Sequence, residues 1–161
     1  MASAPLTLPA KLNPPLTGRD AIVDAVHRCL AGLDAADQGL WESGWHPEGT
    51  MEINGNVMRG RKELHDKCFA TISKLDTTHF MTNVRVTLTD DAGTKAAMTA
   101  TVLAQHYREG KGLAPGEPRI LAGNLYGLNL EKDPADDLWK IKDWVLKSTW
   151  GEGDWQILMG N

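Results

Sequence analysis

Residues 78–107 read THFMTNVRVTLTDDAGTKAAMTATVLAQHY, two long segments on either side of the turn at 90–93. Residue types alternate with a period of two in both segments, which predicts strands, and Asp-Asp-Ala-Gly predicts the hairpin turn between them. In the first segment one side carries Phe80, Val84, Val86 and Leu88, and the other carries His79, Met81, Asn83 and Arg85. In the second, the even positions from Ala96 to Ala104 are apolar and end at His106. The stretch therefore predicts two neighbouring strands of an antiparallel sheet.

The rest of the chain separates into helical and extended parts. After a Gly- and Pro-rich connection, alternation returns at 119–130 and 138–150, which predicts two more long strands. The part before the hairpin has mainly helical spacing. It predicts a helix from Gly18 to Leu33 that Gly32 interrupts, a short helix through Leu40 and Trp41, and a third helix at 61–73. A short strand is predicted at 50–53. We expect Pro47, Gly49 and Gly55 to break the pattern and 46–48 to be a loop. Helices followed by a meander predict an α+β fold, with a curled sheet around the helices and an apolar hollow.

Length and composition restrict the classes of protein. The 161 residues suit one domain, which we place at 17–161 after an extended, proline-containing arm at 1–16. A formal charge of -4 argues against a nucleic-acid binder, and no stretch predicts a signal peptide or a membrane span. Cys29 and Cys68 belong to no metal-binding pattern, so we expect two free thiols and a cytoplasmic protein. No motif indicates a metal or a cofactor.

Polar residues on apolar strand faces are the candidates for a functional site. His79, His106 and Asn124 lie on three successive predicted strands, and Asp34 follows the last apolar residue of the first helix. A carboxylate bonded to one ring nitrogen fixes the tautomer of a histidine and raises the basicity of the other nitrogen. Asp34 and His79 then form a general base, with His106 as a partner acid or a donor to a substrate oxygen and Asn124 orienting the substrate. From spacing alone, a histidine on an apolar face is more often a satisfied core residue than a catalytic one, and Asp34 fits an ordinary helix cap.

Several short motifs in this order resemble the SnoaL-like group of the NTF2-like superfamily, which includes the scytalone dehydratases. The resemblance covers roughly residues 20–154 and rests on Leu33-Asp34, Thr78-His79-Phe80, Gln105-His106-Tyr107, Asn124-Leu125, Trp139-Lys140 and Trp150-Gly151-Glu152. It implies a cone of curved sheet closed by N-terminal helices. It also implies that Asp34, His79, His106 and Asn124 form one active site.

Two tyrosines of the scytalone dehydratase site are missing here. The chain has Leu33 at one position and Ile53 or Asn54 at the other. Tyr126, two residues beyond Asn124, is a candidate replacement that binds substrate through its phenol, although a tyrosine that merely covers the strand fits as well. Among the six tryptophans, Trp41, Trp45 and Trp150 are candidates for stacking on a substrate ring, and packing at the ends of the cone or at a subunit interface suits most of the six.

The resulting hypothesis is a cofactor-independent lyase or isomerase, of dehydratase type, acting on a small oxygenated ring compound. The resemblance implies a setting in secondary-metabolite biosynthesis and a homo-oligomer, with dimer and trimer both open. One alternative is a non-catalytic module that binds a small molecule or a protein through the same fold. Another is an epoxide hydrolase or cyclase, for which Asp143 and Arg85 are the loose candidates. No nucleic-acid or membrane partner is expected.

Overall fold

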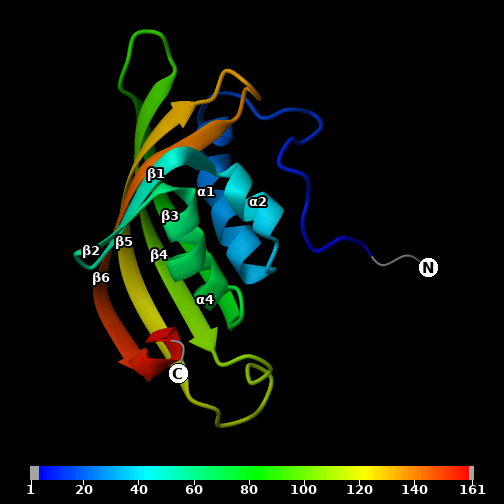
Figure 1. The fold of residues 1–161 in the computed structure, drawn as a ribbon, viewed down its shortest axis with the longest axis vertical. Coiled ribbons are helices and arrows are strands. Elements are labelled where there is room, and N and C mark those ends of the chain that lie inside the picture. Colours follow the sequence, from blue (N-terminus) through cyan, green and yellow to red (C-terminus); the bar gives the residue numbers. More distant parts are fainter. Residues whose placement is uncertain (1–3, 160–161) are drawn as a thin grey trace.

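The computed structural model describes residues 4–159 and contains a six-stranded mixed sheet in the order β2-β1-β6-β5-β4-β3 (Figure 1). The helical elements are α1 (Gly18–Asp34), α2 (Gln38–Ser43), α3 (Gly60–Leu64), the π-helical turn η1 (His65–Phe69), α4 (Ala70–Ile72) and the 3₁₀ helix η2 (Trp155–Met159). The strands are β1 (Trp45–Ile53), β2 (Asn56–Arg59), β3 (Asp76–Leu88), β4 (Lys95–Tyr107), β5 (Arg119–Lys132) and β6 (Trp139–Gly153). The predicted α+β class is confirmed, and the curved sheet stays open.

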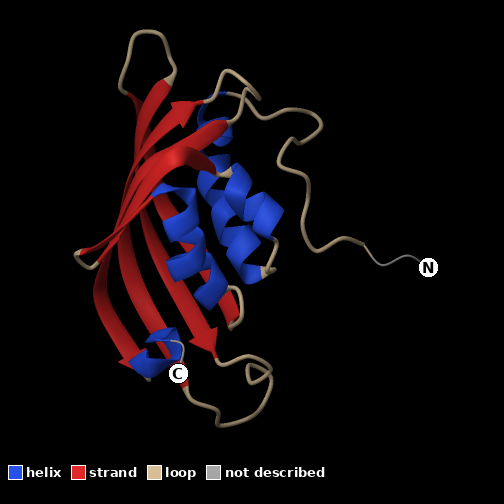
Figure 2. Ribbon diagram, in the orientation of Figure 1, coloured by secondary structure: helices blue, strands red, loops and turns tan. Residues whose placement is uncertain are grey.

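The helices all lie on one side of the sheet, as Figure 2 shows. The even positions of β4 and β5 face these helices and are buried, whereas the odd positions face outward. Burial of apolar side chains between a sheet face and a helix is the main stabilising term of such a two-layer fold. The described part of the N-terminal arm contains neither helix nor strand, as expected, and its first three residues lie outside the described range.

The first strand is longer than predicted, because Pro47 and Gly49 do not interrupt it. β1 begins at Trp45 and runs parallel to β6, with a register shift between Trp45 and Thr50 that takes up the irregular residues, so the expected loop at 46–48 is wrong. A side-chain carbon on Gly49 would lie 2.8 Å from the Trp45 ring, so glycine lets the strand bend over the indole. Pairing of β1 with β6 makes the sheet mixed.

Gly32 does not end the first helix, contrary to expectation. α1 continues to Asp34, and a Cβ on Gly32 would lie only 2.6 Å from the backbone nitrogen of Trp41. Glycine therefore serves close packing of α1 against α2. The Thr17 side chain makes no capping bond at the start of α1, whereas the Asp37 carboxylate caps α2 by accepting from the Leu40 backbone N–H.

The predicted faces of β3 are wrong beyond its middle, because the strand contains a bulge. The register shifts between Thr82 and Arg85, and Asn83 has a left-handed φ of 53°. A bulge inserts one extra residue and so reverses which side chains face the core. His79 and Met81 therefore share the inner face with Val84, Val86 and the exposed Leu88, whereas Phe80 and Arg85 point outward.

Candidate active site

A cavity lies between the concave face of the sheet and the helices. Its volume is about 120 Å³, close to that of a cavity that holds one benzene-sized ring. Its lining is mainly apolar, and the polar side chains that reach it are Asn54, His79, His106, Asn124, Tyr126 and Ser148. They come from the β1–β2 turn and from strands β3, β4, β5 and β6. His79, His106 and Asn124, which the sequence places on three successive strands, thus line one cavity, as predicted.

Asp34 holds His79 at two points. One carboxylate oxygen lies 2.6 Å from His79 Nδ1, and the other accepts the backbone N–H of His79 at 3.0 Å. Asp34 is the last residue of α1, and His79 lies near the start of β3, where its side chain is nearly buried. Since the carboxylate can only accept, it selects the tautomer with the proton on Nδ1 and leaves Nε2 as a free base. This is the geometry of a general base.

His106 lies beside His79, with the two rings edge to face and their centres 5.3 Å apart. Burial, reinforced by the charge of His79 and opposed by that of Asp34, lowers the pKa of His106 to about 4. Thr77 Oγ1 lies 2.7 Å from His106 Nδ1. A neutral ring that accepts this hydroxyl proton at Nδ1 presents Nε2–H to the cavity. The low pKa favours the role of a neutral donor to a substrate oxygen over that of a charged acid.

Asn124 is held by a chain of hydrogen bonds that begins at the β1–β2 turn. Asn54 donates through Nδ2 to Ser148 Oγ (3.1 Å), which in turn donates to Asn124 Oδ1 (2.9 Å). The Asn124 amide nitrogen faces the carbonyl oxygens of Ala122 and Val102. Because two carbonyls surround the nitrogen, the amide orientation is fixed, and only the oxygen retains free capacity, as an acceptor.

Tyr126 is buried on the inner face of β5. Its ring packs edge-on against Trp144, with centres 4.9 Å apart. Burial, together with the neighbouring Cys68 and Asp34, raises the pKa of the phenol well above its usual range. The hydroxyl makes no hydrogen bond to any residue in the described range. It is therefore a neutral, unpartnered polar group in the wall of the cavity.

The set of tryptophans at the cavity differs from the expected one. Trp41, Trp45 and Trp144 are buried and line the cavity, whereas Trp150 is half exposed and is absent from the lining. Trp150 instead covers Gly123, where a Cβ would lie 2.3 Å from its ring. Of the three predicted stacking residues, the structure places Trp41 and Trp45 at the cavity and Trp150 away from it.

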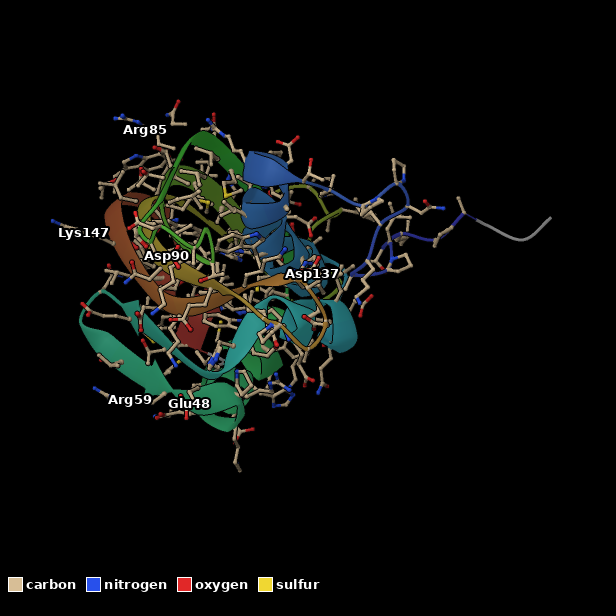
Figure 3. All side chains as sticks on the ribbon, turned by 90° about the horizontal axis from the view of Figure 1, so that it is seen from above. Glu48, Arg59, Arg85, Asp90, Asp137 and Lys147 are labelled. Carbon is tan, nitrogen blue, oxygen red and sulfur yellow. The ribbon has the colours of Figure 1, made fainter. Side chains whose placement is uncertain are left out.

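The charge of the site comes from Asp34 and the histidines. None of the described lining residues is lysine or arginine. Figure 3 shows Arg59, Arg85 and Lys147 extending away from the body of the molecule. Arg85 and Asp143, the candidates for an epoxide hydrolase, also lie outside the lining, with Asp143 bonded to Thr50 and Asn129. Within residues 4–159, no three His, Cys, Asp or Glu side chains form a group that fits a metal ion.

Sequence reasoning missed several residues of the site. Thr77, Asn54, Ser148 and Trp144 were not singled out, although Thr77 and Ser148 carry a signal: each is a small polar residue that pairs across a strand with a predicted site residue, Thr77 with His106 and Ser148 with Asn124. The two cysteines are buried free thiols, as expected. Burial raises the pKa of Cys68, at the cavity wall, to about 12.

Comparisons with known proteins identify the family of this chain and match its fold. A family model described as SnoaL-like domain matches residues 14–145. A relative from Penicillium crustosum, terrestric acid biosynthesis cluster protein E, is 45% identical over 150 residues, which are 93% of this chain and 95% of the relative. Every helix within residues 4–159 falls short of the length and apolar character that a membrane crossing requires.

Solved structures share the fold at low sequence identity. A provisionally assigned scytalone dehydratase from Novosphingobium aromaticivorans is 20% identical at a TM-score of 0.71, covering 84% of this chain and 86% of its own. A type 2 hexachlorocyclohexane dehydrochlorinase is 22% identical at a TM-score of 0.70, and the match covers 84% of this chain and 88% of the dehydrochlorinase. A ketosteroid isomerase-like protein from Erwinia carotovora is 14% identical at a TM-score of 0.63, and the match covers 81% of this chain and 95% of the other. The scytalone dehydratase-like, NTF2-like resemblance of the sequence is confirmed at the level of fold.

Proposed function

The chain belongs to the SnoaL-like domain family, and on this premise we propose that it is a cofactor-independent lyase or isomerase that removes a proton next to a carbonyl group. The observation that carries the proposal is the 2.6 Å contact between Asp34 and His79 Nδ1 at the wall of an apolar cavity. A base of this kind contributes about 10²–10⁴-fold to a rate. The dehydratase and isomerase neighbours support the same class of reaction.

The proposed reaction begins at His79 Nε2. Nε2 takes a proton from the carbon beside a substrate carbonyl, and the C–H electron pair forms a C=C bond while the carbonyl oxygen becomes an enolate. Asp34 stabilises the imidazolium that results, and the neutral His106 N–H holds an oxygen of the substrate. In a dehydration, a β-hydroxyl then leaves with the proton as water. In an isomerisation, the proton returns to another carbon.

The setting we propose is secondary-metabolite biosynthesis, with a small oxygenated ring compound as substrate. The relative that is 45% identical over nearly its whole length takes its name from a terrestric acid biosynthesis cluster. A mostly apolar cavity whose described lining has no lysine or arginine fits an uncharged substrate better than a carboxylate, which the Asp34 charge would repel.

A purely binding module is the weaker alternative. Such a module has no need of a carboxylate that fixes the tautomer of a histidine at the cavity wall, and a satisfied core histidine would bond only to backbone or water. His79 instead has Nδ1 bonded to Asp34 and lines the cavity. Perturbed and paired titrating groups in a concave site favour catalysis.

Hydrogen exchange on an activated ketone tests the proposal without knowledge of the natural substrate. 2-Tetralone in D₂O is followed by NMR for loss of its α-proton signals, with buffer alone as the reference. We expect exchange catalysed by the wild type, loss of at least 10²-fold in His79→Ala, and no loss in His27→Ala, a matched change at an exposed histidine of α1. Equal rates for the wild type and His79→Ala contradict the proposal.

We also propose that two or three copies associate through the outer face of the sheet. A band of apolar side chains crosses this face, formed by Phe80, Leu103 and Leu121 on β3, β4 and β5 and by Trp150 of β6 over Gly123. Phe80 is 57% exposed and Trp150 is 50% exposed. Threonines flank the band on β3 and β4, and Arg119 and Glu152, which carry opposite charges, lie at its edge on β5 and β6.

Light scattering on the purified chain tests the association. We expect a mass of two or three chains for the wild type and a smaller mass for Phe80→Glu, with Lys147→Glu, a charge change on the same sheet, as the control. A wild-type mass of one chain at micromolar concentration rules the association out.

A further inference from the structure

The Tyr126 hydroxyl is a buried polar group for which the proposed reaction has no use. The side chain is 4% exposed, and no residue in the described range accepts or donates a hydrogen bond at its oxygen. The indole N–H groups of Trp45 and Trp144 are also unpartnered, but they are sealed from the cavity space, whereas the Tyr126 hydroxyl is not. Because the hydroxyl faces the cavity space, water can solvate it there, and a substrate oxygen would take the place of that water.

The Tyr126 backbone is offset from that of His79 along the sheet, although the phenol lies near enough to Asp34 for the carboxylate charge to affect it. His79 pairs with Ala104, which pairs with Ala122, and Tyr126 follows Ala122 by four residues on the same face of β5. Four residues of strand span about 13 Å. Both side chains nevertheless line one cavity. A ligand that offers its acidic C–H to His79 therefore presents a different part of itself to the phenol.

The ring of Tyr126 is fixed and its environment is specific. Trp144 packs edge-on against it, and Cys68 and Asp34 are the titrating groups near enough to affect it. The Cys68 thiol is itself neutral because of burial, and Asp34 is bonded to His79. The phenol is thus a neutral O–H in an apolar setting, which pairs best with an uncharged oxygen.

We propose that Tyr126 is a specificity-determining residue, which binds a second hydroxyl or carbonyl oxygen of the substrate, apart from the carbonyl beside the carbon that His79 deprotonates. The proposal rests on the proposed function for the position of that carbon. It narrows the substrate class to uncharged ring compounds with oxygen functions at two ends. A site that holds a polar group for one substrate oxygen discriminates against analogues that lack it.

Calorimetric titration with two inert aromatic probes tests this inference on the full chain. 2,6-Dihydroxynaphthalene carries an oxygen at both ends, and 2-naphthol carries one. We expect the wild type to bind the dihydroxy probe about 3–10-fold more tightly, as one added hydrogen bond provides. In Tyr126→Phe we expect both probes to bind equally, with the preference retained in Tyr107→Phe, a change at the outward-facing tyrosine of β4. Circular dichroism of both variants checks the fold.

The inference is overturned if the wild type shows no preference, if it binds neither probe, or if Tyr126→Phe keeps the preference. Neither probe is turned over, so this result is independent of the base. Unchanged proton exchange in His79→Ala, together with a preference lost only in Tyr126→Phe, would reject the proposed reaction and leave the binding role of Tyr126 in place.

Discussion

Asp34 contacts His79 twice, through the ring at 2.6 Å and through the backbone N–H at 3.0 Å. The two residues are 45 positions apart in the chain, and the contact joins the last residue of α1 to the start of β3. Docking of the first helix on the sheet is therefore also the step that assembles the base. Both carboxylate oxygens are engaged, so the position of the carboxylate and the tautomer of the ring are fixed together.

Asp34→Asn should lower the exchange rate of 2-tetralone by about 10²-fold or more, because an amide can donate to Nδ1 and so place the ring proton on Nε2, where it blocks the base. The measurement is the NMR exchange assay at pH 7. Asp37→Asn, a change three residues away at the α2 cap, should leave both stability and exchange nearly unaffected, because asparagine caps a helix about as well as aspartate. Equal exchange by Asp34→Asn and wild type would remove Asp34 from the mechanism.

The pH dependence of stability should report His106. Its pKa is lowered from 6.5 to about 4 in the folded protein, so between these values the unfolded chain binds more protons and the free energy of unfolding decreases as pH falls. The contribution of the neutral His106 to the free energy of unfolding is fully present above pH 6.5. In urea unfolding, the free energy of unfolding of His106→Asn should decrease by about 2 kcal/mol less than that of the wild type between pH 7 and pH 5. His27→Asn should keep the wild-type slope, and the same slope in His106→Asn would refute the assignment.

Asn83→Val should destabilise the fold by about 1–2 kcal/mol, because a β-branched residue is strained at the left-handed φ of the β3 bulge. Asn83→Gly removes the same side chain without that strain and should be near neutral. Chemical denaturation of both variants separates the backbone effect from the weak bond to Thr101. If the two variants are equally stable, the bulge does not require this conformation.

Gly32→Ala should destabilise by about 1–3 kcal/mol, because the added methyl group would lie 2.6 Å from the backbone nitrogen of Trp41 and would push α2 away from α1. The control is Gly39→Ala in α2, where the nearest atom is at 3.6 Å and alanine is the better helix former. Thermal unfolding is the measurement. A Gly32→Ala variant as stable as Gly39→Ala would show that the helices can separate at no cost.

Most of the architecture was readable from local patterns. The strand limits of β4 were predicted correctly, because its alternation is uninterrupted and its turns are strong. Asp34, His79, His106 and Asn124 were candidates from the sequence, and the structure brings the last three to one cavity and Asp34 to His79. The resemblance to SnoaL-like proteins supplied their grouping. That grouping was beyond the residues alone, since a single histidine on an apolar face also fits a core position.

The sequence by itself determined which residue types alternate, where helices give way to strands and which polar groups must find partners in the interior. Only the tertiary structure decided the rest. The bulge at Asn83 reversed the later face of β3, the close approach of Trp41 kept α1 intact through Gly32, and packing at the cavity left out Trp150 and brought in Trp144. Local propensities contribute tenths of a kcal/mol per residue, whereas burial of a large side chain contributes about 1.5–3 kcal/mol, so long-range packing prevails where the two conflict.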